Sequence, residues 1–553
     1  MVQARKFNQE SYSQMNLRKI CFSIIFLSAL VLGSILFFTR QNLTAKNASI
    51  STKPNYGGAL VVGITGDVDS FNPLFSESSA AQEITHLMLL GLADLNEQSE
   101  FVPELASSWE HSKDYLELTY HLRKDAVWSD GVPITAEDVK FTYDLVMDST
   151  VASPRQGITE YIKKVEVKNP HTVTFHFTKA YPDQIFDTAG EILPKHVLEN
   201  ADRSTLRSHK FGRNPISSGP FIFKKWVSQQ YIELAPNENY FGGRPYLDRV
   251  VFKIVPDQTN LLLQLRTGEV DMMINTPPAE VNRLKSANPN VSIYPVSGRV
   301  YYYIGYNHQN PLFSEVKVRQ ALTMAINRQG IIDAFLYGFG KPCLGPLPPM
   351  LKWIAPDNVE KFPYSFEKSK QILAEAGWQD SDGDGWLDKD GQKFEFSLKT
   401  NAGNQLRADV SVILQDQLRK VGIKVNIETI EWTTMMGQLR SKKFEAYMGG
   451  WSTSFNVDPT PIFHSSSDKM FNFVSYSNPR VDRLIETGRE EMDRPKAAGI
   501  WKETQRLMYE DQPYTFLFWI DKIVGVNNKF KNVTPIPLSA LYNLEKWYQA
   551  ATN

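Results

Sequence analysis

Cysteine is scarce in this chain of 553 residues. There are only two, Cys21 and Cys343, and Cys21 lies in an apolar segment, so the folded body has one thiol and cannot form an internal disulfide. Oxidising compartments permit disulfides without requiring them, so this scarcity does not locate the protein. Net charge is nearly absent too, because 60 basic residues balance 61 acidic ones. We therefore expect no nucleic-acid partner.

Motifs for catalysis and cofactor binding are also missing. The chain has no Gly-x-Ser-x-Gly nucleophile elbow and no His-Glu-x-x-His zinc helix. The nine histidines are scattered. His171 and His176 lie an odd number of residues apart on a predicted strand, so their rings should face opposite sides. These absences argue against an enzyme.

A long apolar run near the start of the chain indicates export. Arg18 and Lys19 precede the uncharged, mostly apolar segment 21–38. This run is longer than the core of a signal peptide and close to the length that spans a bilayer. No small-x-small cleavage site follows Phe38, which slightly favours an uncleaved anchor in the inner membrane over a cleaved signal peptide. Both interpretations place the body outside the cytoplasm.

From residue 57 onward the pattern is that of a mixed α/β protein. Short β-rich runs predict strands at 59–64, 115–122, 165–177, 231–234, 249–254 and 394–399. Apolar residues at helical spacing predict helices at 137–147, 316–327 and 408–421. Thr135 is expected to cap the first of these helices. With 553 residues, the chain should form two or more lobes.

One acidic loop has the spacing of a calcium site. Asp380, Asp382, Asp384 and Asp388 occupy positions one, three, five and nine of the loop, and glycines there permit a sharp turn. The twelfth position is Gly391, where a bidentate glutamate is expected. The loop is thus either a weak structural calcium site or a solvated turn. We expect no other cofactor.

Several short blocks, in a fixed order along the chain, resemble solute-binding protein family 5, which includes periplasmic dipeptide- and oligopeptide-binding proteins. The blocks are 69–74 (DSFNPL), 114–123 (DYLELTYHLR), 127–131 (VWSDG), 135–139 (TAEDV), 217–221 (SSGPF), 239–246 (NYFGGRPY), 265–271 (LRTGEVD), 310–313 (NPLF), 316–321 (VKVRQA) and 511–514 (DQPY). They follow one another in the order of the family between about residues 57 and 530.

The resemblance implies an α/β, bilobal periplasmic-binding-protein fold with two crossover segments and an extra inserted subdomain in the N-terminal lobe. The crossovers are expected near 298–307 and 514–524. The implied domains are a signal or anchor with a polar tether (1–56), an N-terminal lobe (57–301 and 516–553, with the insertion at about 96–205) and a C-terminal lobe (302–515).

The first crossover also contains a tyrosine-rich candidate site. Tyr301 and Tyr303 alternate on a predicted strand, so they face one way and could offer flat apolar contact to a ligand with variable side chains. A strand that only packs in a core is the alternative interpretation. By resemblance, Asn307 in the same segment and Ser218 in the block 217–221 belong to the predicted site.

A second candidate segment is 449–459, which resembles the part of family peptide binders that sets a carboxylate against the ammonium group of the ligand. Asp458 is the matching acid, and Trp451 and Asn456 accompany it. More residues separate Trp451 from Asp458 than in the peptide binders. The alternative is that Asp458 only caps a turn before Pro459.

The function implied by the resemblance is that of the extracytoplasmic substrate-binding subunit of an ABC-type peptide importer. Such a protein captures peptides by hinge closure between its lobes and breaks no bonds. Its expected partners are a peptide and the permease subunits in the membrane, and it should be a monomer. Because a fold does not fix its ligand, a nickel chelate, haem or an oligosaccharide stays an alternative. A membrane-anchored hydrolase or sensor domain is a more distant one.

Overall fold

The computed structural model describes residues 54–355, 361–467 and 470–550. The apolar segment 21–38, on which the predicted signal or anchor rests, lies outside these residues. Within the described part of the chain, no helix combines the length and the apolar character that crossing a bilayer requires.

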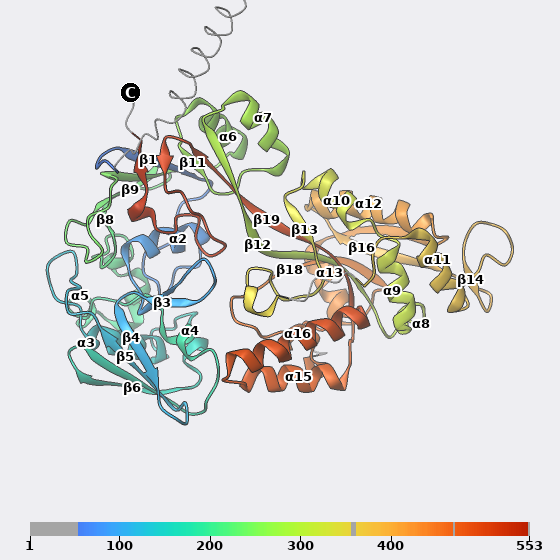
Figure 1. Ribbon diagram of the computed structural model, residues 1–553, viewed down its shortest axis with the longest axis horizontal. Coiled ribbons are helices and arrows are strands. Elements are labelled where there is room, and N and C mark those ends of the chain that lie inside the picture. The colour runs from blue at the N-terminus through green and yellow to red at the C-terminus, as the bar shows by residue number, and fades with distance from the viewer. Residues whose placement is uncertain (1–53, 356–360, 468–469, 551–553) are drawn as a thin grey trace, which may run out of the picture. The chain divides into compact units, whose positions relative to one another are not determined.

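A single mixed sheet runs through both lobes (Figure 1). In the N-terminal lobe its strands are β8 (Phe221–Val227), β9 (Tyr231–Pro236), β10 (Arg249–Ile254), β1 (Ala59–Ile64) and β11 (Met272–Met273). In the C-terminal lobe they are β18 (Ala446–Ser452), β16 (Glu395–Asn401) and β17 (Lys424–Ile430). Parallel pairs join β1 to β10 and β16 to β17. The strands predicted at 59–64 and 249–254 have these bounds in the structure.

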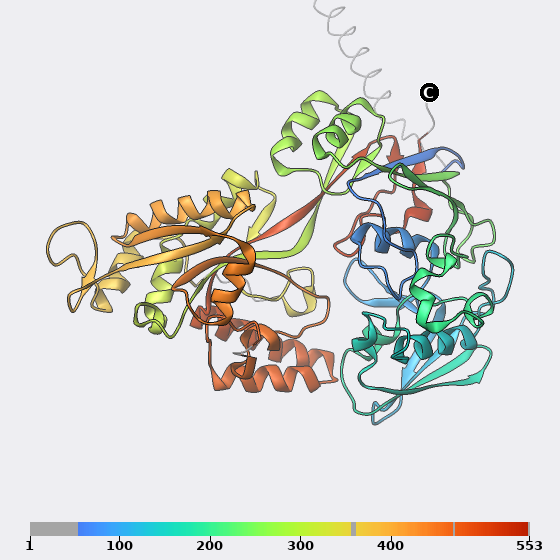
Figure 2. The same cartoon turned by 180° about the vertical axis from the view of Figure 1, so that it is seen from behind.

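Two long strands connect the lobes (Figures 1 and 2). They are β12 (Val291–Tyr306) and β19 (Tyr514–Asn527), which pair antiparallel on both sides of the crossover, while β13 (Gly340–Pro342) pairs with β19 alone. The two predicted crossover segments fall on β12 and β19. Pairing is interrupted between Val296 and Val300, where residues 297–299 lie opposite Asp521 alone. This bulge marks the place where the chain passes from one lobe to the other.

The buried apolar residues confirm that the crossover separates two cores. Those between residues 60 and 296 and between 524 and 547 pack in the N-terminal lobe. Those between residues 301 and 519 pack in the C-terminal lobe. The protein therefore has the bilobal α/β fold expected from its sequence. The boundaries at 301/302 and 515/516 stay a prediction.

A separate antiparallel sheet lies within the predicted insertion. Its order is β4 (Ala106–His111), β5 (Glu117–Leu122), β7 (Thr172–Phe177) and β6 (Ile162–Asn169). The segment 165–177, expected to be one strand, is two strands, because the chain turns between Asn169 and Thr172. Helix α3 (Ala136–Met147) begins at the predicted cap, where Thr135 Oγ1 accepts from the Glu137 amide at 3.3 Å and Asp138 Oδ2 accepts from the Thr135 amide at 2.9 Å.

Helices and short strands complete both lobes. In the N-terminal lobe these are α2 (Ser79–Met88), β2 (Ala93–Leu95), β3 (Phe101–Pro103), α4 (Gln184–Thr188), α5 (Lys195–Leu198), α6 (Gln258–Thr267), α7 (Val281–Ala287), β20 (Phe530–Lys531) and β21 (Tyr548–Gln549). In the C-terminal lobe they are α8 (Pro311–Ser314), α9 (Val316–Met324), α10 (Arg328–Phe335), α11 (Phe366–Glu375), β14 (Asp388–Lys389), β15 (Gln392–Lys393), α12 (Gln405–Arg419), α13 (Trp432–Arg440), α14 (Thr460–Phe463), α15 (Pro479–Glu490) and α16 (Arg494–Asp511). The helices expected at 316–327 and 408–421 are α9 and α12.

Candidate functional site

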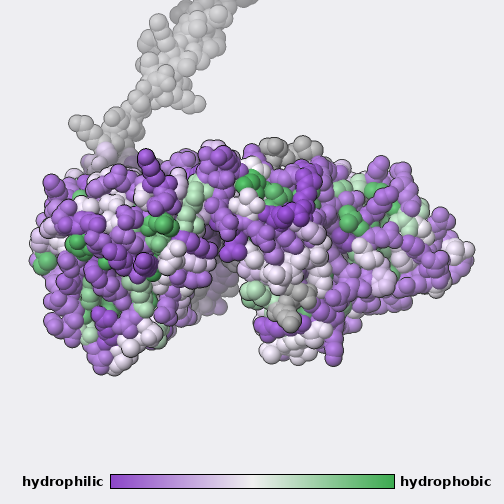
Figure 3. Space-filling model, turned by 90° about the horizontal axis from the view of Figure 1, so that it is seen from below, coloured by the Kyte–Doolittle hydropathy of each residue, from purple (hydrophilic) through white to green (hydrophobic). Residues whose placement is uncertain are grey.

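A cavity of about 820 Å³ lies at the crossover and is lined by residues of both lobes. Its wall includes one face of α2, strand β2, residues 297–300 of the bulge, residues 520–522 of β19 and residues 537–539. The surface in Figure 3 is mostly hydrophilic and is hollowed between the lobes. A volume of this size is typical of pockets that enclose a small ligand. The cavity is therefore the candidate binding site.

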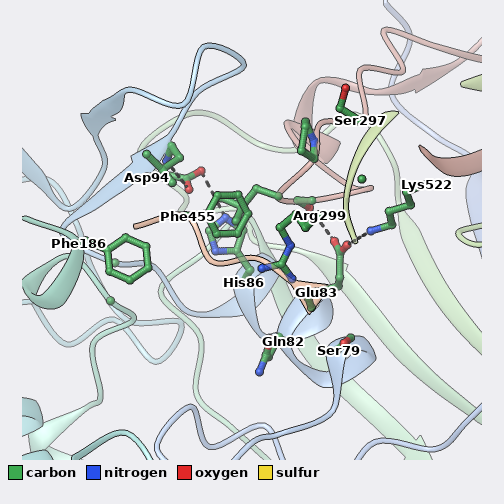
Figure 4. A pocket seen from close by; sticks show the side chains of 18 of the residues that line it. Ser79, Gln82, Glu83, His86, Asp94, Phe186, Ser297, Arg299, Phe455 and Lys522 are labelled. Atoms are coloured by element: carbon green, nitrogen blue, oxygen red, sulfur yellow. Dashed lines mark hydrogen bonds and ion pairs between the residues drawn. The ribbon is translucent and has the colours of Figure 1, made fainter. Parts of the chain in front are cut away.

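Helix α2 brings two charged side chains to the cavity. Glu83 and His86 lie three residues apart and so share one face of the helix (Figure 4). Glu83 Oε1 accepts from Lys522 Nζ at 3.0 Å, and Glu83 Oε2 accepts from Ser539 Oγ at 2.7 Å. The carboxylate of Glu83 thus ties α2 to the crossover strand β19 and to the C-terminal segment.

His86 lies beside two acidic side chains, Asp94 and Glu104, on the same wall. His86 Nε2 lies 3.4 Å from Asp94 Oδ2, and Glu104 Oε2 accepts from the Gly91 amide at 2.8 Å. Burial by itself lowers the pKa of His86, but the contact with Asp94 and the nearby carboxylates raise it to about 10. Burial raises the pKa of Glu104 to about 8, and the charge of Asp94 adds to this effect. At neutral pH His86 is therefore protonated beside the carboxylate of Asp94, and Glu104 is mostly in its neutral form.

Two arginines place positive charge on the cavity. Arg299 lies in the bulge, where its Nη1 donates to the Thr453 carbonyl at 3.2 Å and its guanidinium lies 4.8 Å from the centre of the Phe455 ring. Burial lowers the pKa of Arg299. Among the described residues, no carboxylate forms an ion pair with it, whereas Arg155 pairs with Glu191 at 3.3 Å. Arg299 can therefore bind an anionic or carbonyl group of a ligand.

The predicted tyrosines lie in the core of the C-terminal lobe rather than on the cavity. Tyr301 and Tyr303 are 1% and 2% exposed, and the ring of Tyr303 stacks on that of Tyr514 at 3.9 Å. The intervening Tyr302 lines the cavity together with Val300, because alternate residues of a strand face opposite sides. The two tyrosines do share one face of the strand, but it is the packed face.

The other predicted segment also borders the cavity with different residues. Trp451 pairs with Tyr301 in the sheet and packs against neighbouring aromatic rings. Asp458 Oδ1 accepts from the Thr460 amide at 3.0 Å, and Asp458 Oδ2 lies 3.3 Å from Arg489 Nε. Asn456 accepts a hydrogen bond from Ser454. These residues do not line the cavity, whereas Ser452 and Phe455 of the same segment do.

Ser218 and Asn307 make internal contacts in the structure. Ser218 is 2% exposed, and its Oγ accepts from the Leu90 amide at 2.9 Å. Asn307 Nδ2 donates to the Phe444 carbonyl at 3.1 Å. The Ser218 hydroxyl and the Asn307 amide therefore each connect segments of their own lobe.

The charged residues of the cavity were missed by sequence reasoning. Glu83, His86, Asp94 and Glu104 come from a helix, a strand and the residue after β3, and no motif unites them. The one available signal was Arg299, a charged residue two positions before Tyr301 in the predicted crossover. Its neighbours in the bulge became recognisable only from the pairing of β12 with β19.

The acidic loop forms a compact set of carboxylates with an internal cation. Single oxygens of Asp380, Asp382 and Asp384 lie within 4.8 Å of one another. Lys393 Nζ, however, lies 2.8 Å from Asp382 and 3.0 Å from Asp384. It is also 3.6 Å from Asp388 Oδ2. Calcium would have to displace this ammonium group, so calcium binding stays a prediction.

Comparison with known proteins agrees with the bilobal fold described above. Residues 100–472 match the model of bacterial extracellular solute-binding proteins, family 5 Middle. The chain is 37% identical over 538 residues to the oligopeptide-binding protein AppA of Bacillus subtilis, covering 96% of this chain and 98% of that protein. The structure of that AppA in complex with a nonapeptide aligns with a TM-score of 0.67 at 36% identity, over 90% of this chain and 100% of that one. Heme-binding protein A of Haemophilus influenzae is 28% identical over 75% of this chain and 78% of that protein.

Proposed function

Because the chain belongs to family 5 of the bacterial extracellular solute-binding proteins, we propose that it is the substrate-binding subunit of an ABC-type importer and that its ligands are peptides. The observation that carries this proposal is the cavity at the crossover, which presents both signs of charge beside the bulge where the pairing of β12 with β19 is interrupted. A peptide has the matching chemistry, because it carries an ammonium group, a carboxylate and a regular series of amide groups. The similarity to AppA, an oligopeptide-binding protein, supports the same ligand class.

In this proposal, Arg299 binds a carboxylate or a main-chain carbonyl of the peptide. Its guanidinium is partly desolvated and faces the cavity from the crossover, so an interaction there would strengthen as the lobes close. Tyr302 and Phe455 supply apolar surface on the same side of the cavity. Closure would therefore enclose both the charge and its partner.

The partner of the peptide's ammonium group is a separate proposal. Asp458 is the acid that the sequence predicts, and it would have to exchange its contact with Arg489 for the ligand. Asp521 is the alternative from the structure, since it lines the cavity opposite the bulge. Burial raises the pKa of Asp521, and an ammonium partner would offset that cost. If Asp458 is the partner, Trp451 and Asn456 would position the segment that holds it.

The proposed mechanism consists of binding, hinge closure and release to permease subunits in the membrane, with no chemical step. The protein would act as a monomer outside the cytoplasm. A receptor for a different solute is the second candidate, and the similarity to Heme-binding protein A is the observation that supports it. In that case the charged wall would bind the carboxylates or the ion of the other solute.

Calorimetry with unmodified peptides, from dipeptides to nonapeptides, tests the proposal. We expect saturable binding by wild type and at least tenfold weaker binding by Arg299→Ala, because the change removes the proposed charge partner. Arg213→Ala is the matched control, since Arg213 also lies on an aromatic ring, 3.7 Å from the centre of Trp226, but away from the cavity. Binding of haem or a nickel chelate with no peptide binding would overturn the peptide assignment.

A further inference from the structure

Three potential metal ligands converge on the wall of the cavity. His86 comes from α2, Asp94 from β2, and Glu104 from the residue after β3. One nitrogen or oxygen atom from each lies within 4.8 Å of the other two. In Figure 4 a dashed line marks the contact between His86 and Asp94. The fold thus brings together a donor set that no sequence motif contains.

The spacing of these atoms fits a tetrahedral ion. Zinc binds histidine nitrogen and carboxylate oxygen at about 2.0–2.2 Å, which places two ligands about 3.3–3.5 Å apart at a tetrahedral angle. His86 Nε2 and Asp94 Oδ2 are 3.4 Å apart. Glu104 would move slightly inward to complete the set.

Backbone contacts already orient the two carboxylates. Asp94 Oδ1 accepts from the Leu95 amide at 2.7 Å, and Glu104 Oε2 accepts from the Gly91 amide at 2.8 Å. Each carboxylate therefore keeps one oxygen for an ion. Hydrogen bonds of this kind fix ligands in metal sites and support the metal affinity.

Among the described residues, the cation that pairs with Asp94 is His86, which is itself one of the potential ligands. In the described part of the chain, no lysine or arginine forms an ion pair with Asp94 or Glu104. The acidic loop differs, because Lys393 occupies the space between its carboxylates. A divalent ion bound by His86, Asp94 and Glu104 would replace the protons on His86 and Glu104, because metal ligands bind in their deprotonated forms.

We propose that His86, Asp94 and Glu104 bind one divalent first-row transition-metal ion, with Zn²⁺ as the best match to this donor set. All three residues line the cavity, so a fourth coordination position faces the space where the solute binds. Three protein ligands with one open position are typical of zinc sites that interact with a further molecule. The site requires no particular solute, so it goes beyond the proposed function.

The test is a calorimetric titration of Zn²⁺ into protein that has been treated with EDTA and dialysed, with excess Ca²⁺ present to occupy oxygen-only sites. We expect one Zn²⁺ per chain for wild type and at least tenfold weaker binding for His86→Ala and for Glu104→Gln. The glutamine keeps an oxygen that can accept from the Gly91 amide, so the second variant remains informative if the first does not fold. Zn²⁺ should also raise the melting temperature of wild type more than that of either variant.

His196→Ala is the matched control. His196 Nε2 lies 2.9 Å from Asp130 Oδ2, and His196 is about as exposed as His86, but no third ligand joins the pair. This variant should bind Zn²⁺ like wild type. Absence of saturable Zn²⁺ binding by wild type, or equal affinity in wild type and both site variants, would show that His86 and Asp94 form only an ion pair. Peptide binding by the EDTA-treated protein tests the proposed function separately.

Discussion

Replacing Gly298 by alanine should push the two crossover strands apart. Gly298 lies in the bulge of β12, and a Cβ there would lie 1.8 Å from the carbonyl oxygen of Ile520 in β19. Cβ contacts shorter than 3.0 Å essentially never occur, so the strands would have to separate by roughly 1.2 Å. Because the opposing atom belongs to the backbone, no side chain can rotate to relieve the clash.

The expected cost is about 1–3 kcal/mol in the free energy of unfolding, which is the usual range for an overpacked site. Peptide affinity should fall as well, by at least tenfold, because the shift moves Arg299 and Tyr302 relative to the opposite wall. Chemical denaturation measures the first effect and calorimetry the second.

Gly437→Ala provides the control for this experiment. Gly437 lies within α13, and a Cβ there would have no heavy atom within 4 Å outside its own helix. This change should leave peptide affinity unaltered. It should raise the free energy of unfolding by up to about 1 kcal/mol, since alanine has a higher helix propensity than glycine. If Gly298→Ala has the same free energy of unfolding and the same peptide affinity as wild type, the crossover can adjust freely and the reasoning is wrong.

Three further predictions concern single side chains. Asp458→Asn should weaken peptide binding at least tenfold, and acetylating the peptide's N-terminus should penalise wild type but not the mutant; equal penalties in calorimetry would exclude Asp458 as the ammonium partner. Millimolar Ca²⁺ should raise the melting temperature, and more so in Lys393→Met, which lacks the competing ammonium; no change in either would make the acidic loop a turn only. Burial raises the pKa of Asp187 to about 7 from its ordinary 3.8, so the folded state loses stability as the pH rises from about 4 to 7. Asp187→Asn should therefore match wild type at pH 4 and exceed its free energy of unfolding by on the order of 1 kcal/mol at pH 8, and an equal difference at both pH values would contradict this.

Local patterns predicted many elements because their causes are local. The capped start of α3 depends on Thr135 and Asp138, three residues apart, and the structure confirms it. The segment 165–177 was harder, since β-rich residues continue on both sides of a tight turn. The dipeptide Asn169-Pro170 inside this segment is a turn signal, and the prediction of one strand passed over it, although the chain reverses there between β6 and β7.

Alternation along β12 shows why the candidate site was only partly predictable. The period of two correctly placed Tyr301 and Tyr303 on one face and Tyr302 on the other. It could not say which face borders the cavity, because both faces of this strand carry aromatic residues. Packing decided the question: the core of the C-terminal lobe takes Tyr301 and Tyr303, and Tyr302 is left to the cavity.

The sequence by itself determined the family, the α/β class and the two crossover segments, since ordered blocks and short periodicities are properties of the chain alone. Only the tertiary structure decided which charges share a wall. His86, Asp94 and Glu104 meet because α2, β2 and β3 pack beside the crossover, and Lys393 enters the acidic loop because β15 pairs with β14. Such contacts depend on how separate elements pack in space, and no spacing along the chain encodes them.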